Sequence, residues 1–416
     1  MVNMQMTGAQ MVLKALEDQQ VDTIFGYPGG AVLPIYDELA KTKDTNHQIR
    51  HFLVRHEQGA SHAAEGYARS SGKVGVMLVT SGPGVTNAVT GLTDAMMDSI
   101  PLVCISGQVP THLIGTDAFQ ECDAVGITRP CTKHNWLVKD INDLSRILHE
   151  AFYVASSGRP GPVLVDIPKD IQFQTGTYIG PDTVKHKSYR PKLKANIDNI
   201  DDALKLIAEA EKPIFYTGGG VINSGNAAVQ LLREFVRLTG FPITSTLQGL
   251  GAFPGDDTQF VGMLGMHGTY EANMAMNECD LMINIGARFD DRITGKIDEF
   301  SPNSKKIHID IDPSSINKVV NVDVALVGDV AHVLEDAIKL WKSKVYKVNK
   351  SQVKDWWKQI DKWKERDSLG FNEDKKTIKP QHAIQRLYEL TKEKDVFVTT
   401  EVCLLYTSPS PRDGQI

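Results

Sequence analysis

Residues Val74–Gly84, with the sequence VGVMLVTSGPG, decide the fold. The apolar run from Val74 to Val79 has the length and continuity of a strand that is buried on both faces. It ends in a turn rich in glycine and proline, after which apolar residues recur at helical spacing up to Met96. A buried strand, a tight turn and a helix in this order form the repeating unit of a parallel α/β sheet.

The same alternation continues on both sides of this stretch. A helix capped by Thr7 opens the chain, and the other predicted strands of the first block are at 23–25, 52–54, 102–106 and 163–166. A second alternating block starts near Asn196. Its predicted strands are at 213–217, 243–245, 281–285, 306–311 and 325–327. We therefore predict an α/β fold with two successive doubly wound parallel-sheet domains.

Changes in composition suggest where the domains end. The predicted divisions are a first domain at 1–170, a linker at 171–195, a second domain at 196–345, a linker at 346–378, the start of a third α/β domain at 379–402 and a Ser/Pro-rich tail at 403–416. In the second linker, Trp356, Trp357 and Trp363 have the spacing of one helix face, which predicts a helix that docks on a domain.

The composition argues against several classes of protein. The 416 residues include 51 acidic and 45 basic ones, a formal net charge of −6, so we expect no nucleic-acid-binding face. No apolar run approaches the roughly 18 residues of a membrane span, and the N-terminus lacks the pattern of a signal peptide. Five scattered cysteines, at 104, 122, 131, 279 and 403, suit a reducing compartment. We expect buried, inert thiols and a cytoplasmic protein.

Three glycine-rich turns follow predicted strands, at 26–30, 81–84 and 218–220. Turns at the carboxyl ends of parallel strands either hold ligands or only connect elements. None of the three has the spacing of a dinucleotide-binding or P-loop motif, so both interpretations remain open.

Several polar side chains also admit two interpretations. Glu57 begins a predicted helix, where a carboxylate either complements the helix dipole or transfers protons. His267 and Glu271 are four residues apart on a predicted helix, but a metal pair would need a third ligand. Asp310 and Asp312 end a strand, where an acid can accept a hydrogen bond from a ribose hydroxyl.

Ordered motifs along the chain nevertheless resemble those of one enzyme family. FGYPGGA at 25–31, RHEQ at 55–58 and TSGPG at 80–84 resemble the N-terminal domain of thiamine-diphosphate-dependent carboligases and decarboxylases. Further motifs resemble the large catalytic subunit of acetolactate synthase, also called acetohydroxyacid synthase. These are GQVP at 107–110, DAFQE at 117–121, SGRPGP at 157–162, DIPKD at 166–170, GMLGMHG at 262–268 and GARFDDR at 286–292. The resemblance covers residues 5–402.

The resemblance implies a reaction and a role for Glu57. The family decarboxylates pyruvate on thiamine diphosphate and transfers the two-carbon unit to pyruvate or 2-ketobutyrate, which begins branched-chain amino-acid biosynthesis. The family's characteristic glutamate matches Glu57, which would hydrogen-bond the aminopyrimidine ring and favour its imino tautomer. Alternatives are a related carboligase or pyruvate oxidase, or a non-catalytic flavin-binding protein, although the latter would have no use for Glu57.

The resemblance also implies sets of binding residues. Gly30 would lie near the reacting centre, and Gln120 and Lys169 would lie near the active-site channel, contributed across a dimer interface. The substrate channel would be lined by Val109, Pro110, Phe119, Met266, Asp291 and Arg292. A structural FAD, which does no net redox chemistry, would be contacted by Arg159, His267, Gly268, Gly286, Arg288, Asp310, Asp312 and Asp329.

The sequence departs from the family near its end. The family binds the cofactor's diphosphate through Mg²⁺ in a third domain, at Gly-Asp-Gly and a later Asn, and that signature is absent from this chain. We expect residues 403–416 to be frameshifted or foreign and the chain alone to be inactive. The implied partners of the intact enzyme are 2-keto acids, a second copy in a homodimer or dimer of dimers, and a small regulatory subunit.

Overall fold

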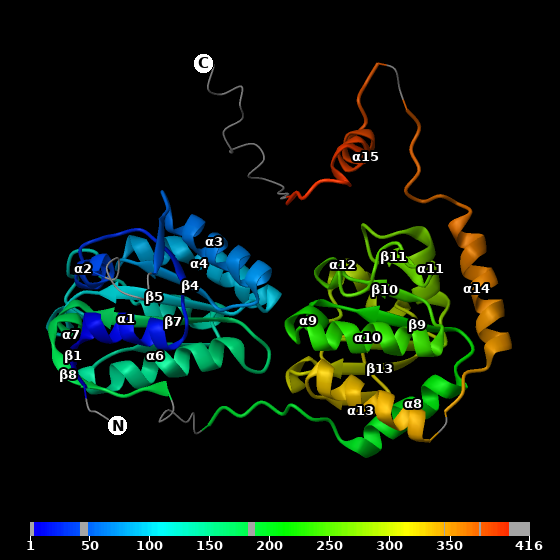
Figure 1. Cartoon of the computed structure of the whole chain (residues 1–416), viewed down its shortest axis with the longest axis horizontal. Helices are drawn as coiled ribbons and strands as arrows, with labels where there is room; N and C mark the ends of the chain where they lie inside the picture. Colours follow the sequence, from blue (N-terminus) through cyan, green and yellow to red (C-terminus); the bar gives the residue numbers. More distant parts are fainter. Residues whose placement is uncertain (1–3, 42–48, 182–187, 345, 374–375, 399–416) are drawn as a thin grey trace. The chain divides into compact units, whose positions relative to one another are not determined.

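The computed structural model describes residues 4–41, 49–181, 188–344, 346–373 and 376–398 (Figure 1). The chain divides into two compact units, residues 1–366 and 367–416. The first unit contains two α/β domains, each with its own sheet.

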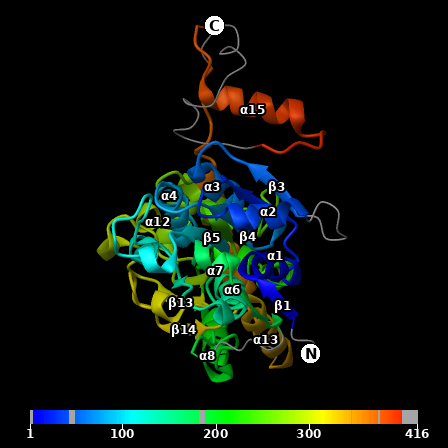
Figure 2. The ribbon, with the colours of Figure 1, turned by 90° about the vertical axis from the view of Figure 1, so that its left-hand side faces the viewer.

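The first domain is built on a parallel sheet. Its described residues form six strands in the order β3-β2-β4-β5-β7-β6. The bounds are β2 (Thr23–Gly26), β3 (Arg50–Leu53), β4 (Gly75–Val79), β5 (Leu102–Gln108), β6 (His134–Leu137) and β7 (Pro162–Pro168). Every residue of β4, β5 and β7 is buried, as expected for central strands covered on both faces. The strand β3 forms one edge of this sheet (Figure 2).

Helices cover both faces of this sheet (Figure 1). One face packs on α1 (Gly8–Asp18), α2 (Leu33–Lys41) and α6 (Ile141–Ser156), and the other on α3 (Glu57–Ser71), α4 (Pro83–Asp98) and α5 (Ala124–Thr128). Helix α1 begins as predicted. The Thr7 side chain accepts a hydrogen bond from the amide of Gln10, and the Gln10 side chain accepts one from the amide of Thr7, which is a capping box.

The chain leaves this domain later than the sequence suggests. A short helix, α7 (Lys169–Phe173), follows β7, and the next strand, β8 (Thr175–Tyr178), pairs antiparallel with β1 (Met4–Thr7). Residues 171–178 of the expected linker therefore pack with the first domain. The cause is the pairing of β8 with the N-terminal strand, which local sequence does not reveal.

The second domain is also a parallel α/β domain. In the described part of the chain its strand order is β11-β10-β9-β12-β13-β14. The bounds are β9 (Pro213–Thr217), β10 (Ile243–Ser245), β11 (Phe260–Met263), β12 (Leu281–Ile285), β13 (Lys305–Asp310) and β14 (Val324–Val327). One core includes α8 (Ile197–Glu209), α9 (Gly219–Asn223), α10 (Asn226–Thr239) and α13 (Val330–Ser343). The opposite core includes α11 (Tyr270–Glu278).

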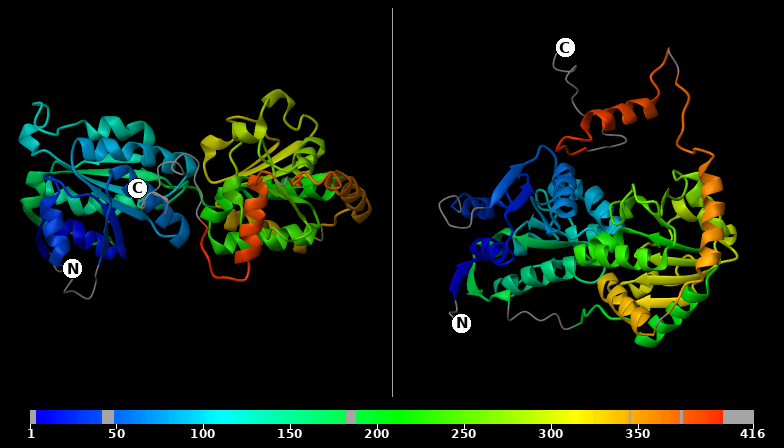
Figure 3. Two further views of the ribbon diagram at one scale, coloured as in Figure 1. Left: turned by 90° about the horizontal axis from the view of Figure 1, so that it is seen from above. Right: turned by 45° about the vertical axis from the view of Figure 1, so that its right-hand side comes forward.

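The tryptophan-rich segment forms the helix α14 (Lys350–Lys364), as its spacing predicts. Figure 3 shows this helix, in orange, alongside the green and yellow second domain. Trp356 is 3% exposed, and its indole Nε1 donates to the carbonyl oxygen of Pro213 at 3.0 Å. Trp357 Nε1 donates to the carbonyl oxygen of Gly240 at 2.9 Å. Part of the expected linker 346–378 is therefore a packed helix of the second domain.

The described part of the second unit contains one regular element, α15 (Pro380–Thr391). The apolar run in VFVTT at 396–400, within the predicted start of a third domain, is typical of a strand, but the described residues 396–398 are not in a strand. No described strand pairs with them, and strand conformation depends on such pairing. Residues 399–402 and the predicted foreign tail 403–416, including Cys403, lie outside the described residues.

The predicted fold class is confirmed: both domains have parallel sheets, and in each of them helices cover the sheet. The strands β9, β10 and β12 have the predicted bounds. Within the two parallel sheets, the strands β6 and β11 were not predicted, because HNWL and FVGM are short and have no clear alternation. The antiparallel pair of β1 and β8 was not predicted either.

The packing of α14 predicts a large effect for Trp356→Ala. Removing a buried indole leaves a cavity and the unpaired Pro213 carbonyl group, so the free energy of unfolding should fall by about 3–5 kcal/mol. Lys358→Ala is the control, because this side chain on the same helix is 67% exposed. Urea unfolding followed by circular dichroism measures both variants. Equal stability of the two would contradict the docking of α14.

Candidate functional site

The first candidate site lies where the strand order of the first sheet reverses. The chain moves from β2 to β3 on one side and then to β4 on the other, so their following loops diverge at the carboxyl edge. In parallel α/β sheets, ligands bind in the crevice at this point. The loop after β2 contains Gly30, the loop after β4 contains Gly82, and α3 begins with Glu57 soon after β3.

Glu57 has the setting of a functional carboxyl group. It is the first residue of α3, and the cap residue His56 accepts a hydrogen bond from the Gln58 amide through its ring nitrogen Nδ1 at 3.2 Å. The Glu57 side chain is buried, with the residue only 7% exposed. Its Oε2 accepts a hydrogen bond from Asn87 Nδ2 at 2.9 Å. The helix dipole and this amide stabilise the carboxylate inside the protein, and its other oxygen, Oε1, is not used in that bond.

Gly30 differs from the glycine next to it. A Cβ atom at Gly29 would lie 2.6 Å from the side chain of Thr80, so packing requires glycine there. At Gly30, the same atom would meet nothing within 4 Å, and its φ is not in the left-handed region. The described chain therefore leaves open space beside the backbone of Gly30, on the loop that borders the crevice.

A second loop approaches the same crevice. A Cβ atom at Gly82, whose φ is +55°, would come within 3.1 Å of the Gln120 backbone, so the predicted site residue Gln120 lies against the TSGPG turn. The neighbouring side chain of Phe119 is 88% exposed. Gln120 itself has φ of 58°, a left-handed conformation that is uncommon outside glycine.

Lys169 and Val109 sit at the end of the same sheet, on α7 and directly after β5. Val109 is buried, and its amide donates to Gln108 Oε1 at 2.9 Å. Pro110 follows it. Lys169 is half-buried at the start of α7, and the next residue, Asp170, accepts hydrogen bonds from Thr111. These contacts connect the two segments, and within the described chain Lys169 has no hydrogen bond or ion pair with Glu57.

The second candidate site is a cavity of about 820 Å³ in the first unit. It spans the carboxyl ends of the second sheet, at the loops after β9, β10, β12, β13 and β14. Numbered from the first strand of the domain, the order of this sheet is 3-2-1-4-5-6. That order is typical of dinucleotide-binding domains, in which the ligand crosses the sheet where the order reverses, here between β9 and β12.

Glycines from two loops pack against each other at this reversal. A Cβ atom at Gly220 would lie 2.7 Å from Gly286 Cα, and one at Gly286 would lie 2.8 Å from Gly220 Cα. Gly286 also has φ of +63°. Both loops line the cavity, so their backbones are exposed to a ligand without intervening side chains.

The cavity brings together most of the predicted flavin contacts. Its lining includes Arg159, His267, Gly286, Arg288, Asp310 and Asp329. Gly268 and Asp312 are not among the lining residues. Asp312 instead lies 3.6 Å from Arg159, between Oδ2 and Nη1, and Gly268 packs against the backbone of Leu264.

Two predicted channel residues, Met266 and Arg292, also line this cavity. Met266 is 67% exposed. Arg292 Nη1 lies 3.2 Å from Asp291 Oδ2, and both side chains are largely exposed. The structure therefore places part of the predicted channel at the cavity of the second domain, whereas Phe119 and Val109 lie at the first sheet.

Of the other lining residues, sequence reasoning left the turn Gly218–Gly220 open between ligand binding and a simple connection, and it overlooked Leu247 and Gln248. The glycine run after a predicted strand was the available signal, although its spacing matches no known motif. Gln248, on a short 3₁₀ turn, gave no signal at all. It accepts a hydrogen bond from Arg69 at 2.6 Å and donates to Asp98 at 2.9 Å.

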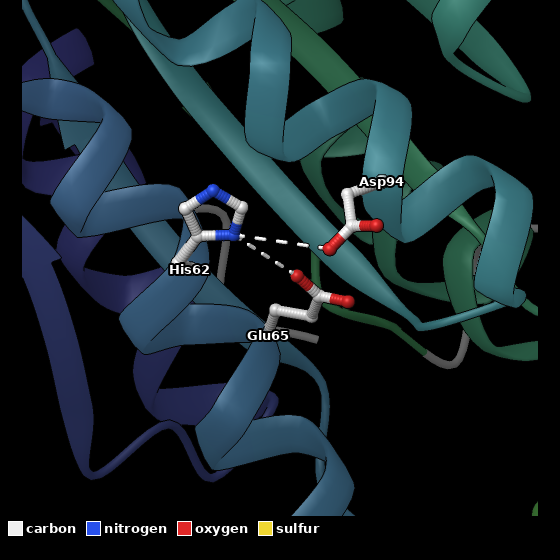
Figure 4. Close-up of side chains that lie close together, drawn as sticks. All are labelled: His62, Glu65 and Asp94. Carbon is white, nitrogen blue, oxygen red and sulfur yellow. Dashed lines mark hydrogen bonds and ion pairs between the residues drawn. The ribbon is translucent and has the colours of Figure 1, made fainter. Parts of the chain in front are cut away.

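One group of possible metal ligands occurs in the described chain: His62, Glu65 and Asp94 (Figure 4). His62 Nδ1 lies 3.4 Å from Glu65 Oε2 and 3.9 Å from Asp94 Oδ2. Burial raises the pKa of the Glu65 carboxyl group, while Arg69, 2.8 Å away, opposes this shift. Since Arg69 already balances the Glu65 charge, ion pairing accounts for the group without a metal.

The structure also bears on the expected spacing of His267 and Glu271 and on the expected state of the cysteines. His267 lies in the loop before α11, whose cap is Thr269, so His267 and Glu271 do not share a helix as predicted. The capping hydrogen bond from Ala272 to Thr269 starts the helix after His267. The four cysteines in the described chain are free, and burial raises the pKa of their thiols. Cys104, Cys131 and Cys279 are buried as expected, whereas Cys122 is half-buried. Across the described helices, none is both long and apolar enough to cross a membrane.

Comparison with known proteins identifies both domains. Residues 6–127 match the thiamine pyrophosphate enzyme N-terminal TPP-binding domain, and residues 200–337 match the central domain of the same enzymes. Relatives named acetolactate synthase large subunit include one from Buchnera aphidicola, 50% identical over 95% of this chain and 68% of the relative. The isozyme 3 large subunit of Escherichia coli is 49% identical over 95% and 68% of the two chains. A large subunit from Haemophilus influenzae is 49% identical with the same coverage.

The burial of Asp166, on β7 beside β5, predicts that the stability of the protein depends on pH in a specific way. Asp166 accepts hydrogen bonds from Ser106 at 2.6 Å and Gln108 at 3.0 Å, but burial raises its pKa to about 7. The unfolded chain loses this proton near pH 4, whereas the folded chain keeps it until about pH 7. The contribution of Asp166 to stability therefore falls as pH rises through this window and then stays constant.

The variant Asp166→Asn should remove that dependence. Between pH 5 and pH 8, the stability of the wild type should fall relative to the variant by about 2–3 kcal/mol. Altered hydrogen bonding in the variant would change its free energy of unfolding by the same amount at every pH, so it does not affect the difference in pH dependence. Urea unfolding at a series of pH values measures the effect, and parallel curves for the two proteins would refute it.

Proposed function

The chain belongs to the acetolactate synthase large-subunit family of thiamine-diphosphate enzymes, and from this premise we propose that Glu57 is its catalytic acid-base residue in making acetolactate from pyruvate. When bound, thiamine diphosphate supplies the electron sink for decarboxylation of a 2-keto acid. The observation that carries the assignment is the buried Glu57 carboxyl group at the reversal point of a TPP-binding domain.

The residues of the first crevice fit the aminopyrimidine part of this cofactor. Oε1 of Glu57 is not used in the bond to Asn87, so it is the oxygen that would hold or move a proton at a ring nitrogen. The open space beside Gly30 allows a flat ring to approach the backbone. A buried carboxylate at this position has no evident use in a protein that only binds a flavin.

We also propose that the second cavity holds FAD as a structural group. The strand order, the glycine contact between two loops and the volume of about 820 Å³ all fit a dinucleotide. Arg159 and Arg288 would hold phosphates, and Asp310 and Asp329 would accept hydrogen bonds from ribose hydroxyls. His267, Gly268, Gly286 and Asp312 complete the proposed set.

The residues described here do not fit a Mg²⁺–diphosphate site. The metal would need several oxygen ligands close together. Neither crevice offers such a group, and the cluster at His62 is balanced by Arg69. No step of the reaction is therefore assigned to Mg²⁺ on these residues.

The proposed substrate channel consists of Val109, Pro110, Phe119, Met266, Asp291 and Arg292, with Gln120 and Lys169 near it. Within the described chain the exposed guanidinium group of Arg292 pairs with the exposed Asp291, and a 2-keto acid carboxylate could replace that partner. Phe119, at 88% exposure, is the side chain that we propose a second copy of the chain covers in a homodimer or dimer of dimers. The relatives are named large subunits, which supports a small regulatory subunit as a further partner.

The role of Glu57 is tested by Glu57→Gln. The amide keeps the shape of the side chain but cannot move a proton, so acetolactate formation from pyruvate should fall by a factor of about 10²–10⁴. The assay uses this chain joined to the C-terminal portion of the Escherichia coli isozyme 3 large subunit that lies beyond the matched region. Glu278→Gln, at an exposed position on α11, is the control and should keep full activity. Undiminished turnover in Glu57→Gln would rule out the assigned role.

The flavin proposal is tested on the chain as it stands. Titration with FAD, followed by quenching of flavin fluorescence, should show one site per chain. Arg159→Met should weaken binding by about tenfold, because a charge-assisted contact to phosphate is lost. Arg237→Met is the control, since Arg237 pairs with Asp257 away from the cavity. Failure of the wild type to bind FAD would overturn the proposal.

A further inference from the structure

We propose that Asn284 and His308 are positioning residues for dinucleotide binding, because their buried side chains hold the peptide groups of Ala287 and so fix the turn Gly286–Arg288. This inference rests on the proposed FAD site. It concerns residues that do not line the cavity and that neither the motifs nor the relatives single out.

The register of the sheet places a row of polar residues beneath this turn. Tyr216 on β9 pairs with Asn284 on β12, which in turn pairs with His308 on β13. Side chains at matching positions of parallel strands point to the same face. All three residues are 0% exposed, so any polar group among them needs a partner inside the protein.

Two members of the row form hydrogen bonds with one residue of the turn, Ala287. Asn284 Nδ2 donates to the Ala287 carbonyl oxygen at 2.9 Å, and the Ala287 amide donates to Asn284 Oδ1 at 3.1 Å. His308 Nε2 lies 3.1 Å from the same carbonyl oxygen. Because a carbonyl oxygen only accepts, Nε2 carries the proton, and Nδ1 has no partner within the described chain.

The residues on either side of Ala287 belong to the cavity itself. The Gly286 carbonyl oxygen accepts from the Gly220 amide at 2.9 Å, and the Gly286 amide donates to Ile309 at 2.8 Å. The next residue, Arg288, projects into the cavity and lies 2.6 Å from Asp290. The hydrogen bonds to the amide and the carbonyl group of Ala287 therefore fix the positions from which the Gly286 backbone and the Arg288 guanidinium group would contact a ligand.

Tyr216 provides the comparison that separates positioning from general packing. Its hydroxyl group is buried and has no hydrogen-bond partner in the described chain. It lies in the same row, next to Asn284, but its hydroxyl group forms no hydrogen bond with the turn within the described chain. Loss of this hydroxyl removes a buried polar group from the same place without releasing Ala287.

The test compares Asn284→Leu with Tyr216→Phe on the chain as it stands. Leucine has the same branched arrangement of side-chain heavy atoms as asparagine but offers Ala287 no hydrogen bond, so the dissociation constant for FAD should rise about tenfold. Tyr216→Phe should leave that constant within a factor of two. Flavin fluorescence quenching measures binding, and circular dichroism of the flavin-free protein confirms that each variant is folded.

The outcomes distinguish this inference from the proposal beneath it. If the wild type does not bind FAD, the flavin site fails and the inference fails with it. If the wild type binds FAD and folded Asn284→Leu binds it equally well, only the positioning role is refuted. If Asn284→Leu does not fold, His308→Gln and His308→Leu provide the test. Glutamine can still donate a hydrogen bond to Ala287, so only the leucine variant should lose affinity for FAD. Equal affinities of these two variants would overturn the inference.

Discussion

Both proposed sites depend on one constraint of parallel sheets. Successive parallel strands need crossover connections, and when the chain reverses its direction of travel across the sheet, two neighbouring loops turn away from each other. The reversal lies between β2 and β4 in the first domain and between β9 and β12 in the second. The crevice at each reversal exposes loop backbone, and the chain has placed its glycine-rich turns and its buried acid there.

Buried polar groups keep these edges in shape. Asn87 supports Glu57, Gln108 supports Val109, and Asn284 supports Ala287, in each case through an amide side chain. An amide can donate and accept at once without carrying charge, so it satisfies buried groups without the desolvation penalty of an ion. Asp166 shows the contrast, since burial of a carboxyl group in the same region raises its pKa to about 7.

The sequence predicts the fold class because buried parallel strands are continuous apolar runs, as in residues 74–79. It misses β6 and β11, which are short, and also β1 and β8, which pair with each other although they are far apart in the chain. Strand order is not encoded locally either. The second sheet has the dinucleotide-binding order although its turn at 218–220 lacks the usual glycine spacing, so only the three-dimensional pairing reveals it.

The same distinction applies to the sites. Glu57 could be singled out because the motif around it resembles a family and the start of α3 is visible in the sequence. Asn284 could not, because a single asparagine in an apolar run predicts only a weak strand position. Its proposed positioning role follows from its register with Tyr216 and His308 and from its hydrogen bond with Ala287 in the turn after β12. Several of the residues proposed to touch a ligand are thus readable as motifs, whereas those proposed to hold the ligand's loop in place become visible only when neighbouring strands are compared in register.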